Sequence, residues 1–270
     1  LPDIKPPSFP ADAPAPTSRP PIRKWDIFRV FLRSFFVQSV WNYRSLISVG
    51  FGICLIPVLK RLYSDTESRQ AFLNRHLKYF NAHPYMASYA LGVSIHLEEA
   101  LASGNAEAGP KLERMKSLLV SILGAVGDRL FWSTIKPYSL IIGMMLLFPL
   151  ENPAWQLAAL AGTFLIYNLP HLYLRYNGIW EGYTYGLEVH KCLDEQRFQK
   201  LEKVYLFSGS FAFLLFLALL IAKIFAESLL SAAMMGGAAV LALIIYRATK
   251  SFYFTIIITL VISILMGFIF

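Results

Sequence analysis

Long runs of apolar residues fill the second half of the chain and are separated by short polar segments. A helix needs about 20 predominantly apolar residues to cross the hydrocarbon core of a bilayer. Runs that meet or approach this length predict membrane-spanning helices at residues 130–150, 154–174, 204–226, 229–246 and 251–270. The pattern therefore predicts an all-α, polytopic integral membrane protein.

The first half of the chain has a different pattern, in which apolar and charged positions alternate over shorter distances. Residues 25–44 place apolar side chains among arginines at helical spacing, which predicts an amphipathic helix at an interface or against a partner subunit. Residues 45–59, interrupted by Pro57, and residues 84–97 are apolar but too short to span a bilayer. We expect both segments to form re-entrant, broken or buried helices.

Proline dominates the N-terminal segment, where it occupies eight of the first 21 positions. This composition lacks the apolar run of a signal peptide or a packed core. Residues 1–24 are therefore expected to form a disordered, locally extended cytoplasmic tail. Residues 25–270 are expected to form one membrane domain, with amphipathic and re-entrant helices over 25–137 and a transmembrane bundle over 138–270.

Composition and charge support a membrane protein. Hydrophobic residues make up 56% of the chain, charged residues 16%, and the mean hydropathy is +0.50, whereas soluble domains carry about 25% charged residues. The net charge of +8 accompanies no basic stripe with interleaved aromatic residues, so nucleic acid is not an expected partner. Loops rich in Lys and Arg instead fit the anionic cytoplasmic face of a lipid bilayer.

The distribution of positive charge also predicts an orientation. Residues 191–203 form a basic block, and Arg247 with Lys250 follow two predicted spans later. The positive-inside rule places both groups in the cytoplasm and puts Phe270 at the external face. We therefore expect a multi-pass plasma-membrane protein with a cytoplasmic N-terminus.

Polar blocks adjoin these apolar runs at residues 38–43, 75–81 and 124–128. Ionisable side chains and unwound backbone are costly at membrane depth, and they persist mainly where they line a cavity or a ligand path. The blocks therefore favour transport of a polar molecule as the function.

The block at residues 124–128 reads Gly-Ala-Val-Gly-Asp and has two interpretations. Its glycines allow a tight turn or a close helix approach, and Asp128 can then cap the following helix. Alternatively, unwound backbone and Asp128 bind sugar hydroxyls at a broken helix. Trp132 follows four residues later, and an aromatic face beside a carboxylate is a common way to hold a sugar ring.

Motifs for catalysis and metal binding are absent from the sequence. It contains no nucleophile elbow, no Walker loop and no dinucleotide fingerprint. His76, His83 and His96 lack the spacing of metal ligands, and Cys54 and Cys192 form no paired motif. We therefore expect no catalytic residue, no metal and no cofactor.

Several stretches, taken in order, resemble one known family. They include Gln-Ser-Val-Trp-Asn-Tyr at 38–43, Arg-His-Leu at 75–77, Glu-Glu at 98–99, residues 124–137 and residues 168–186. From residue 27 to residue 190 the chain resembles the IID component of the mannose/fructose/sorbose family of the bacterial sugar phosphotransferase system.

The resemblance implies a non-catalytic subunit of the bacterial inner membrane, paired with a IIC membrane subunit in a hetero-oligomer. In this family the pair carries a hexose inward, and a soluble IIB protein phosphorylates it with phosphate received from IIA. The IID chain carries no transferable phosphate. The resemblance also implies broken-helix hairpins, which the short apolar segments 45–59 and 84–97 would form.

The chain departs from the family pattern close to Asp128. Leu-Val-Ser-Ile-Leu at 119–123 replaces the usual Met-Gly-Pro-Leu, Arg129 replaces a usual proline, and Lys136 replaces a usual arginine. Arg129 is placed to neutralise the Asp128 carboxylate, by direct pairing or through its field. These departures favour an alternative function, a divergent membrane-bound regulatory or docking component of the phosphotransferase system with little transport.

Polarity at membrane depth and the resemblance together select the candidate sugar-binding residues. They are Asn81, Glu98, Asp128, Trp132 and Thr134, with Gln38 and Asn42 as weaker candidates. Retention of five of them favours the permease over the regulatory alternative: Gln38, Asn42, Asn81, Glu98 and Thr134.

Overall fold

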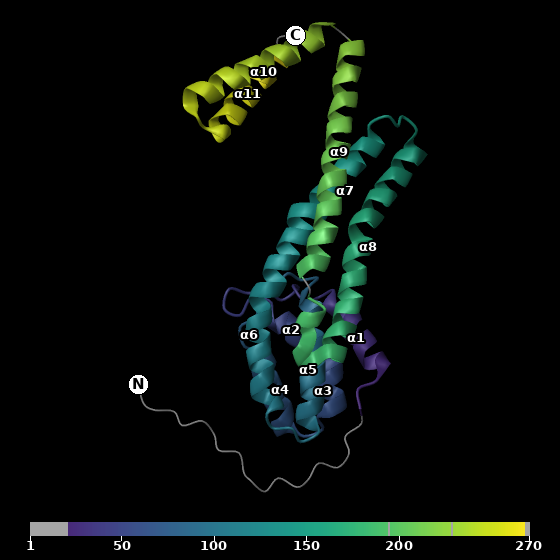
Figure 1. Ribbon diagram of the computed structural model, residues 1–270, viewed down its shortest axis with the longest axis vertical. Coiled ribbons are helices and arrows are strands. Elements are labelled where there is room, and N and C mark those ends of the chain that lie inside the picture. Colours follow the sequence, from purple (N-terminus) through teal and green to yellow (C-terminus); the bar gives the residue numbers. More distant parts are fainter. Residues whose placement is uncertain (1–20, 194, 228, 268–270) are drawn as a thin grey trace. The chain divides into compact units, whose positions relative to one another are not determined.

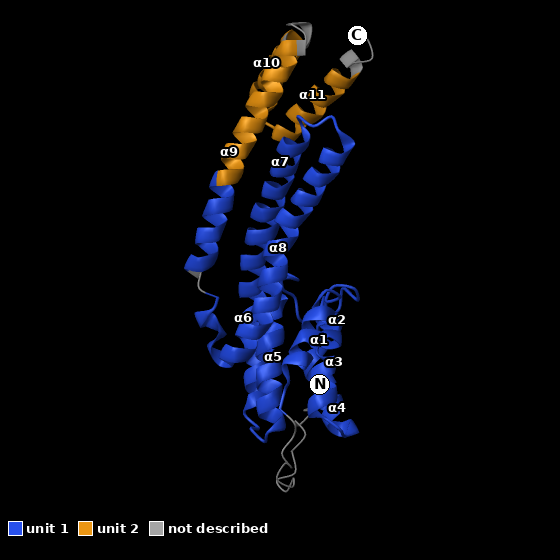
Figure 2. Ribbon diagram, turned by 90° about the vertical axis from the view of Figure 1, so that its right-hand side faces the viewer, with its two compact units in different colours: residues 1–207 blue, residues 208–270 orange. Residues whose placement is uncertain are grey.

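The computed structural model of the protein describes residues 21–193, 195–227 and 229–267, and all regular secondary structure among them is helical. The helices are shown in Figure 1, and the chain forms two compact units, residues 1–207 and 208–270, which Figure 2 shows in different colours. The predicted all-α fold is confirmed. The predicted tail, residues 1–24, lies for its first 20 residues outside the described part of the chain.

Short helices form the N-terminal part of the first unit. They are α1 (Lys24–Ser34), α2 (Ser48–Cys54), α3 (Ile56–Leu62) and α4 (Thr66–His76). Helix α1 is amphipathic, with Ile27 and Val30 buried on one face and Trp25 and Leu32 exposed on another. It ends at Ser34 rather than near residue 44, and a loop follows it.

The apolar segment 45–59 contributes to two helices instead of one. Helix α2 ends at Cys54, and α3 carries Pro57 in its first turn, where the missing N–H of proline is not needed for a helical hydrogen bond. Most side chains of both helices are buried, as expected. A re-entrant placement of these helices in a bilayer stays a prediction.

Helix α5 (Ala87–Ala102) is the centre of the first unit. Its side chains are buried on every face over most of its length, as expected for a helix enclosed by others. It packs most extensively against α8 (Pro153–Tyr185) and then against α6 (Ala108–Gly127). Residues 87–97 of the predicted segment 84–97 therefore belong to a buried helix that continues to Ala102, and residues 84–86 belong to the loop before it.

Glycines allow α5 and α8 to approach each other closely. Gly92 of α5 faces the backbone of Ile179 and Tyr183, while Gly182 of α8 faces the backbone of Tyr89. Small residues at a helix contact let two backbones approach without a clash between side chains. This contact fixes α8 against the core.

Long apolar helices carry the membrane-spanning character of the chain. Among the described residues, those long and apolar enough to cross a membrane are Ala108–Leu147, Pro153–Lys191 and Gln196–Ala226. They include most or all of the predicted spans 130–150, 154–174 and 204–226. The prediction placed the first of these helices too late, because α6 already begins at Ala108.

The first long helix continues from α6 through a π-helix, η1 (Asp128–Ile135), into α7 (Lys136–Leu147). Helix α8 follows after a short connection, and Asn152 caps it by accepting a hydrogen bond from the Ala154 amide at 2.9 Å. A short 3₁₀ helix, η2 (Gly186–Lys191), completes the second long element. Helices α7 and α8 pack side by side as an antiparallel pair (Figure 1).

The second unit contains the later part of α9 (Glu195–Glu227), α10 (Leu229–Thr249) and α11 (Phe252–Gly267). Helices α10 and α11 pack against each other and overlap the predicted spans 229–246 and 251–270, whose last three residues lie outside the described part of the chain. Their apolar stretches within the described residues, Ala233–Thr249 and Phe252–Ile264, are shorter than a full span. The sequence divided amphipathic and re-entrant helices, over 25–137, from a transmembrane bundle, over 138–270. This division falls inside α7, whereas the boundary between the compact units lies after Phe207 in α9.

Replacing Gly92 with alanine should lower the free energy of unfolding of the first unit by about 1–3 kcal/mol, the usual cost of overpacking. The added Cβ would lie within 2.6 Å of the Tyr183 backbone nitrogen. Gly124→Ala is the matched control, because nothing lies within 4 Å of its Cβ position. Thermal unfolding of both variants in detergent checks this, and equal unfolding temperatures would contradict the close α5–α8 contact.

Candidate functional site

Two loops meet beside the start of α5. The loop at residues 35–47 follows α1, and the loop at residues 77–86 joins α4 to α5. The Ile47 amide donates to the Phe80 carbonyl at 3.2 Å, and the Phe80 amide donates to the Ser45 carbonyl at 3.4 Å. This pairing brings together the loops that carry two of the three predicted polar blocks.

Asn42 maintains the conformation of the first loop. Its Oδ1 accepts hydrogen bonds from the backbone amides of Arg44 and Ser45, at 3.0 and 2.9 Å. Gln38 on the same loop and Asn81 on the second loop are exposed. The Asn42 amide is therefore used within the loop, whereas the other two amides are accessible.

The third polar block enters the π-helix η1 without a break. Asp128 has helical backbone angles, φ −62° and ψ −44°, and no side chain caps η1. The interpretations as a tight turn, as unwound backbone and as an Asp128 cap are therefore wrong. Gly127 does allow a close contact, but its neighbour is the His83 side chain of the loop at residues 77–86 rather than another helix.

Thr134 stabilises the wide turn of η1. Its hydroxyl donates to the Arg129 carbonyl, five residues earlier, at 2.8 Å, and its side chain is buried. Helical turns of the π type are rare, and they lie frequently at functional sites. This segment is therefore the first candidate for a functional element.

Buried aromatic and histidine rings pack behind η1. The His83 ring stacks on Phe131, with centroids 5.1 Å apart, and meets Trp132 edge to face at 5.4 Å. Tyr85 stacks on His171 of α8 at 4.2 Å. We call the following residues the π-helix cluster: His83, Tyr85, Phe131, His171 and Arg175.

Arg175 places a buried positive charge in this cluster. Its side chain is 3% exposed and its Nη1 donates to the carbonyl of Ser34 and, at 3.3 Å, to the Ser34 hydroxyl. The guanidinium lies over the rings of Phe35 and Tyr85, at 4.9 and 5.1 Å. No carboxylate among the described residues pairs with it, and a buried cation without a countercharge indicates a functional position.

Several nitrogens of the π-helix cluster have no hydrogen-bond partner in the described part of the chain. They are His83 Nε2, His171 Nδ1 and Arg175 Nε, all of them buried. Native interiors contain few such atoms, so each needs an explanation. Burial, followed by the charge of Arg175, lowers the pKa of His83 to about 4, and its ring is therefore neutral near pH 7.

Asp128 and Trp132 occupy the exposed side of η1. Trp132 is 54% exposed, and the Asp128 carboxylate makes no hydrogen bond or ion pair with any residue that the structure describes. Arg129 instead directs its Nε to the Glu202 carboxylate of α9 at 2.9 Å. Direct pairing of Arg129 with Asp128, one of the two predicted routes to neutralisation, is therefore not present.

Glu98 lies in a separate, fully buried site. Its oxygens accept hydrogen bonds from the Tyr63 hydroxyl at 2.7 Å, from Arg75 Nε and Nη2 at 2.9 Å each, and from His76 Nε2 at 2.9 Å. Burial alone would raise the pKa of Glu98, but the hydrogen bonds from His76 and Arg75 outweigh it and hold the pKa at about 2. The carboxylate is therefore ionised and has no open acceptor site.

Lys116 of α6 extends this arrangement to a fourth helix. Its Nζ donates to the Arg75 carbonyl at 3.1 Å and lies over the rings of Phe51 and Phe80. We call Tyr63, Arg75, His76, Glu98 and Lys116 the Glu98 network. None of its members belongs to the π-helix cluster or to η1, which carries Asp128, Trp132 and Thr134.

The sequence interpretation did not select Tyr85, His171 or Arg175. A signal was present, because His171 and Arg175 lie four residues apart in an apolar run and therefore share one face of a helix. No group of three or more His, Cys, Asp or Glu side chains among the described residues is arranged to hold a metal ion.

Comparison with known families identifies the chain. A profile of the family described as "PTS system mannose/fructose/sorbose family IID component" matches residues 21–224. The chain belongs to this family. PTS denotes the phosphotransferase system, so the protein is a membrane subunit of such a system.

Individual relatives agree with the IID assignment. The chain is similar to the mannose-specific EIID component of Escherichia coli strain K12, with 31% identity over 198 residues that cover 70% of this chain and 66% of the relative. It is also similar to the fructose permease IID component of Bacillus subtilis strain 168, with 32% identity over 180 residues, 67% of this chain and 64% of the relative. The chain thus spans slightly less than two thirds of the length of these relatives.

A solved structure supports the IID fold. The chain is similar to a chain in the cryo-EM structure of the mannose transporter ManYZ in complex with microcin E492, with a TM-score of 0.57 and 31% identity. The similarity covers 75% of this chain and 71% of that chain. The family match contains both the π-helix cluster and the Glu98 network, and it ends before α10.

Replacing Glu98 with glutamine should lower the free energy of unfolding of the IID chain by about 3–5 kcal/mol, because Arg75 would keep a largely buried charge without a countercharge. Glu113→Gln is the matched control. Its ion pair with Lys78 is 2.6 Å long but exposed, so its loss should cost less than about 1 kcal/mol. Denaturant unfolding in detergent checks both, and similar losses would contradict the role of the Glu98 network.

Acid should destabilise the first unit through His76. Burial lowers the pKa of this ring to about 4, whereas an unfolded chain would give about 6.5. The neutral ring therefore contributes stability that is complete above pH 6.5 and is lost as the pH falls toward 4.

Unfolding measured at successive pH values between 7 and 4.5 tests this expectation. His76→Gln should reduce the loss over this window, because glutamine does not titrate, while His83, whose pKa burial also lowers to about 4, keeps its own contribution. His190→Gln, at an exposed histidine, serves as the control and should keep the wild-type profile. If His76→Gln also kept the wild-type pH profile, His76 would not be a group that causes the loss of stability in acid.

Proposed function

We propose that the protein is the IID subunit of a sugar permease that carries a hexose of the mannose/fructose/sorbose type into the cell with a IIC membrane subunit. In this proposal the two subunits form a hetero-oligomer in the bacterial inner membrane, with the N-terminus of this chain in the cytoplasm. A soluble IIB protein phosphorylates the sugar with phosphate received from IIA. The names of the mannose-specific and fructose relatives support this substrate class.

The observation that carries the proposal is the placement of Asp128 and Trp132 on the exposed side of η1. A carboxylate accepts strong hydrogen bonds from hydroxyl groups, and an indole face packs against the apolar face of a sugar ring. The two side chains lie four residues apart on one helical segment. One sugar can therefore contact both.

The predicted sugar-binding residues divide into two groups by their contacts. Exposed side chains are proposed to contact the sugar, and these are Asp128, Trp132, Asn81 and Gln38. Side chains already bonded within the protein are proposed to hold the site in shape, and these are Thr134, Asn42 and Glu98.

The unpaired nitrogens of the π-helix cluster support a site that changes conformation. A buried donor or acceptor without a partner costs about 1–3 kcal/mol. A second conformation that supplies partners to His83, His171 and Arg175 would recover this free energy. Alternation between two such states is what a carrier requires.

The regulatory alternative rests mainly on neutralisation of Asp128 by Arg129. The structure pairs Arg129 with Glu202 at 2.9 Å, so the two charges largely cancel each other in the neighbourhood of Asp128. This arrangement leaves the carboxylate accessible, and it supports transport over a purely docking role.

Asp128→Asn should lower the rate of sugar uptake about tenfold or more, because hydrogen bonds to a charged acceptor contribute about 1.5–3 kcal/mol. Trp132→Ala should lower it by several-fold through loss of stacking. Uptake of radiolabelled mannose and fructose by cells that express the chain with its companion subunits measures both effects.

Matched controls separate a site defect from a general one. Glu151→Gln removes an exposed carboxylate and Trp155→Ala removes an exposed tryptophan, both at the α7–α8 connection. These variants should transport normally at equal membrane abundance. Normal uptake by Asp128→Asn and Trp132→Ala would instead remove η1 from the sugar path.

A further inference from the structure

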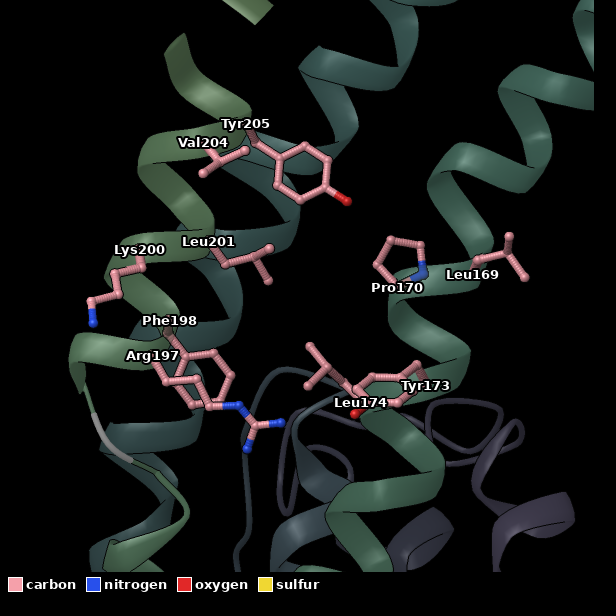
Figure 3. Close-up of a pocket in the computed structure, with 10 residues that line it drawn as sticks. All are labelled: Leu169, Pro170, Tyr173, Leu174, Arg197, Phe198, Lys200, Leu201, Val204 and Tyr205. Carbon is pink, nitrogen blue, oxygen red and sulfur yellow. The ribbon is translucent and has the colours of Figure 1, made fainter. Parts of the chain in front are cut away.

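A groove lies between α8 and the first turns of α9, within the first unit (Figure 3). It has a volume of about 630 Å³, which is in the range of sites for small molecules. Leu169 and Pro170 of α8 form one wall, and Phe198, Leu201 and Val204 of α9 form the facing wall. The groove is therefore largely apolar.

Two basic residues of α9, Arg197 and Lys200, line the groove. The Arg197 guanidinium points toward α8 at one end, Lys200 lies level with Leu201 with its side chain extended away from α8, and Val204 and Tyr205 line the opposite end (Figure 3). Arg197 Nη1 lies 3.3 Å from the Glu181 carboxylate, so part of its charge is compensated. Lys200 is exposed and makes no hydrogen bond or ion pair with a residue in the described part of the chain.

The Arg197–Glu181 ion pair joins α9 to α8 at one end of the groove, and farther along α9 contacts two other elements. Glu202 pairs with Arg129 of η1, and Tyr205 contacts Tyr138 of α7 edge to face with ring centroids 4.9 Å apart. These contacts hold one side of α9, and its neighbouring face turns toward α8 across the groove. The side chains that line an apolar groove of this size lack dispersion contacts on one side unless another molecule fills it.

We infer that the groove binds an anionic phospholipid, with an acyl chain against Leu201 and Val204 and the phosphate of the headgroup at Arg197 and Lys200. Both walls belong to helices long and apolar enough to span the membrane, so lipid is the solvent around them. Basic pockets between transmembrane helices on the cytoplasmic side attract anionic headgroups. The basic block at residues 191–203 is on that side by the positive-inside rule.

The occupant follows from charge complementarity. An apolar helix of a companion subunit would satisfy the walls but would leave Lys200 without a counterion. A neutral, zwitterionic lipid would fill the walls and match the basic end less well. An anionic lipid satisfies both, and it would add to the Arg197–Glu181 contact between α9 and α8.

Native mass spectrometry of the full chain, purified with the membrane subunits that accompany it, tests this site. The sample is equilibrated with equal amounts of phosphatidylglycerol and phosphatidylethanolamine, and the lipids retained are counted. The wild type should retain phosphatidylglycerol preferentially. Lys200→Ala should lower the ratio of the two retained lipids about fivefold, the effect expected of one basic residue near an anionic lipid.

Lys203→Ala is the matched control, because it removes the same charge from the same helix but does not line the groove. It should leave the ratio unchanged, and an equal fall in both variants would overturn the site in favour of diffuse surface attraction. Val204→Trp, which fills the groove, should lower retention of both lipids. If Val204→Trp lost a companion subunit but retained as much lipid as the wild type, the proposal would be overturned in favour of a protein in the groove.

A second measurement does not depend on variants. Phosphatidylglycerol with a photoactivatable acyl chain is crosslinked to the wild-type protein, and the modified peptides are identified. Crosslinks at residues 198–204 and 169–174 support the groove. Crosslinks confined to α10 and α11 would overturn it.

Discussion

The burial of one carboxylate charge is the constraint on which the first unit depends. Glu98 is fully buried, and it remains ionised because Tyr63, Arg75 and His76 supply four hydrogen bonds from the ends of α3 and α4. Arg75 and His76 thereby attach the end of α4 to α5. The loop at residues 77–86 starts from this fixed point and supplies His83 and Tyr85 to the π-helix cluster. The Glu98 network thus positions the candidate site without contacting it.

The helical, membrane-spanning character of the chain was predictable because the length and spacing of apolar runs are local properties. The π-helix was not, because one widened turn barely alters the spacing of apolar residues along a helix. The two glycines before Asp128 indicated a break in the backbone. The structure shows that Gly127 instead accommodates the His83 ring while the helix continues.

The candidate site was predictable only where its residues are close in sequence. Asp128 and Trp132 were selected together because they lie four residues apart. The partners of Glu98 lie 22 to 35 residues away from it, and Ser34 and Arg175 are separated by 141 residues. Contacts of this kind depend on which helices pack together, which no local pattern specifies. The resemblance selected Glu98 as a sugar-binding candidate. Its hydrogen bonds to Tyr63, Arg75 and His76 indicate instead that it holds the helices of the first unit together.

The wide turns of η1 also determine the direction in which α7 faces. Each residue of an α-helix rotates the next side chain by about 100°. The wide turns of η1 rotate each side chain by less, so η1 can hold an additional residue and keep the phase between α6 and α7. Gly143 of α7 fits against Thr163 of α8 only in the phase that η1 provides. If η1 became a regular α-helix of the same length, the added rotation would turn Gly143 away from α8. The relative orientation of two spanning helices is therefore set by the wide turns of an eight-residue segment.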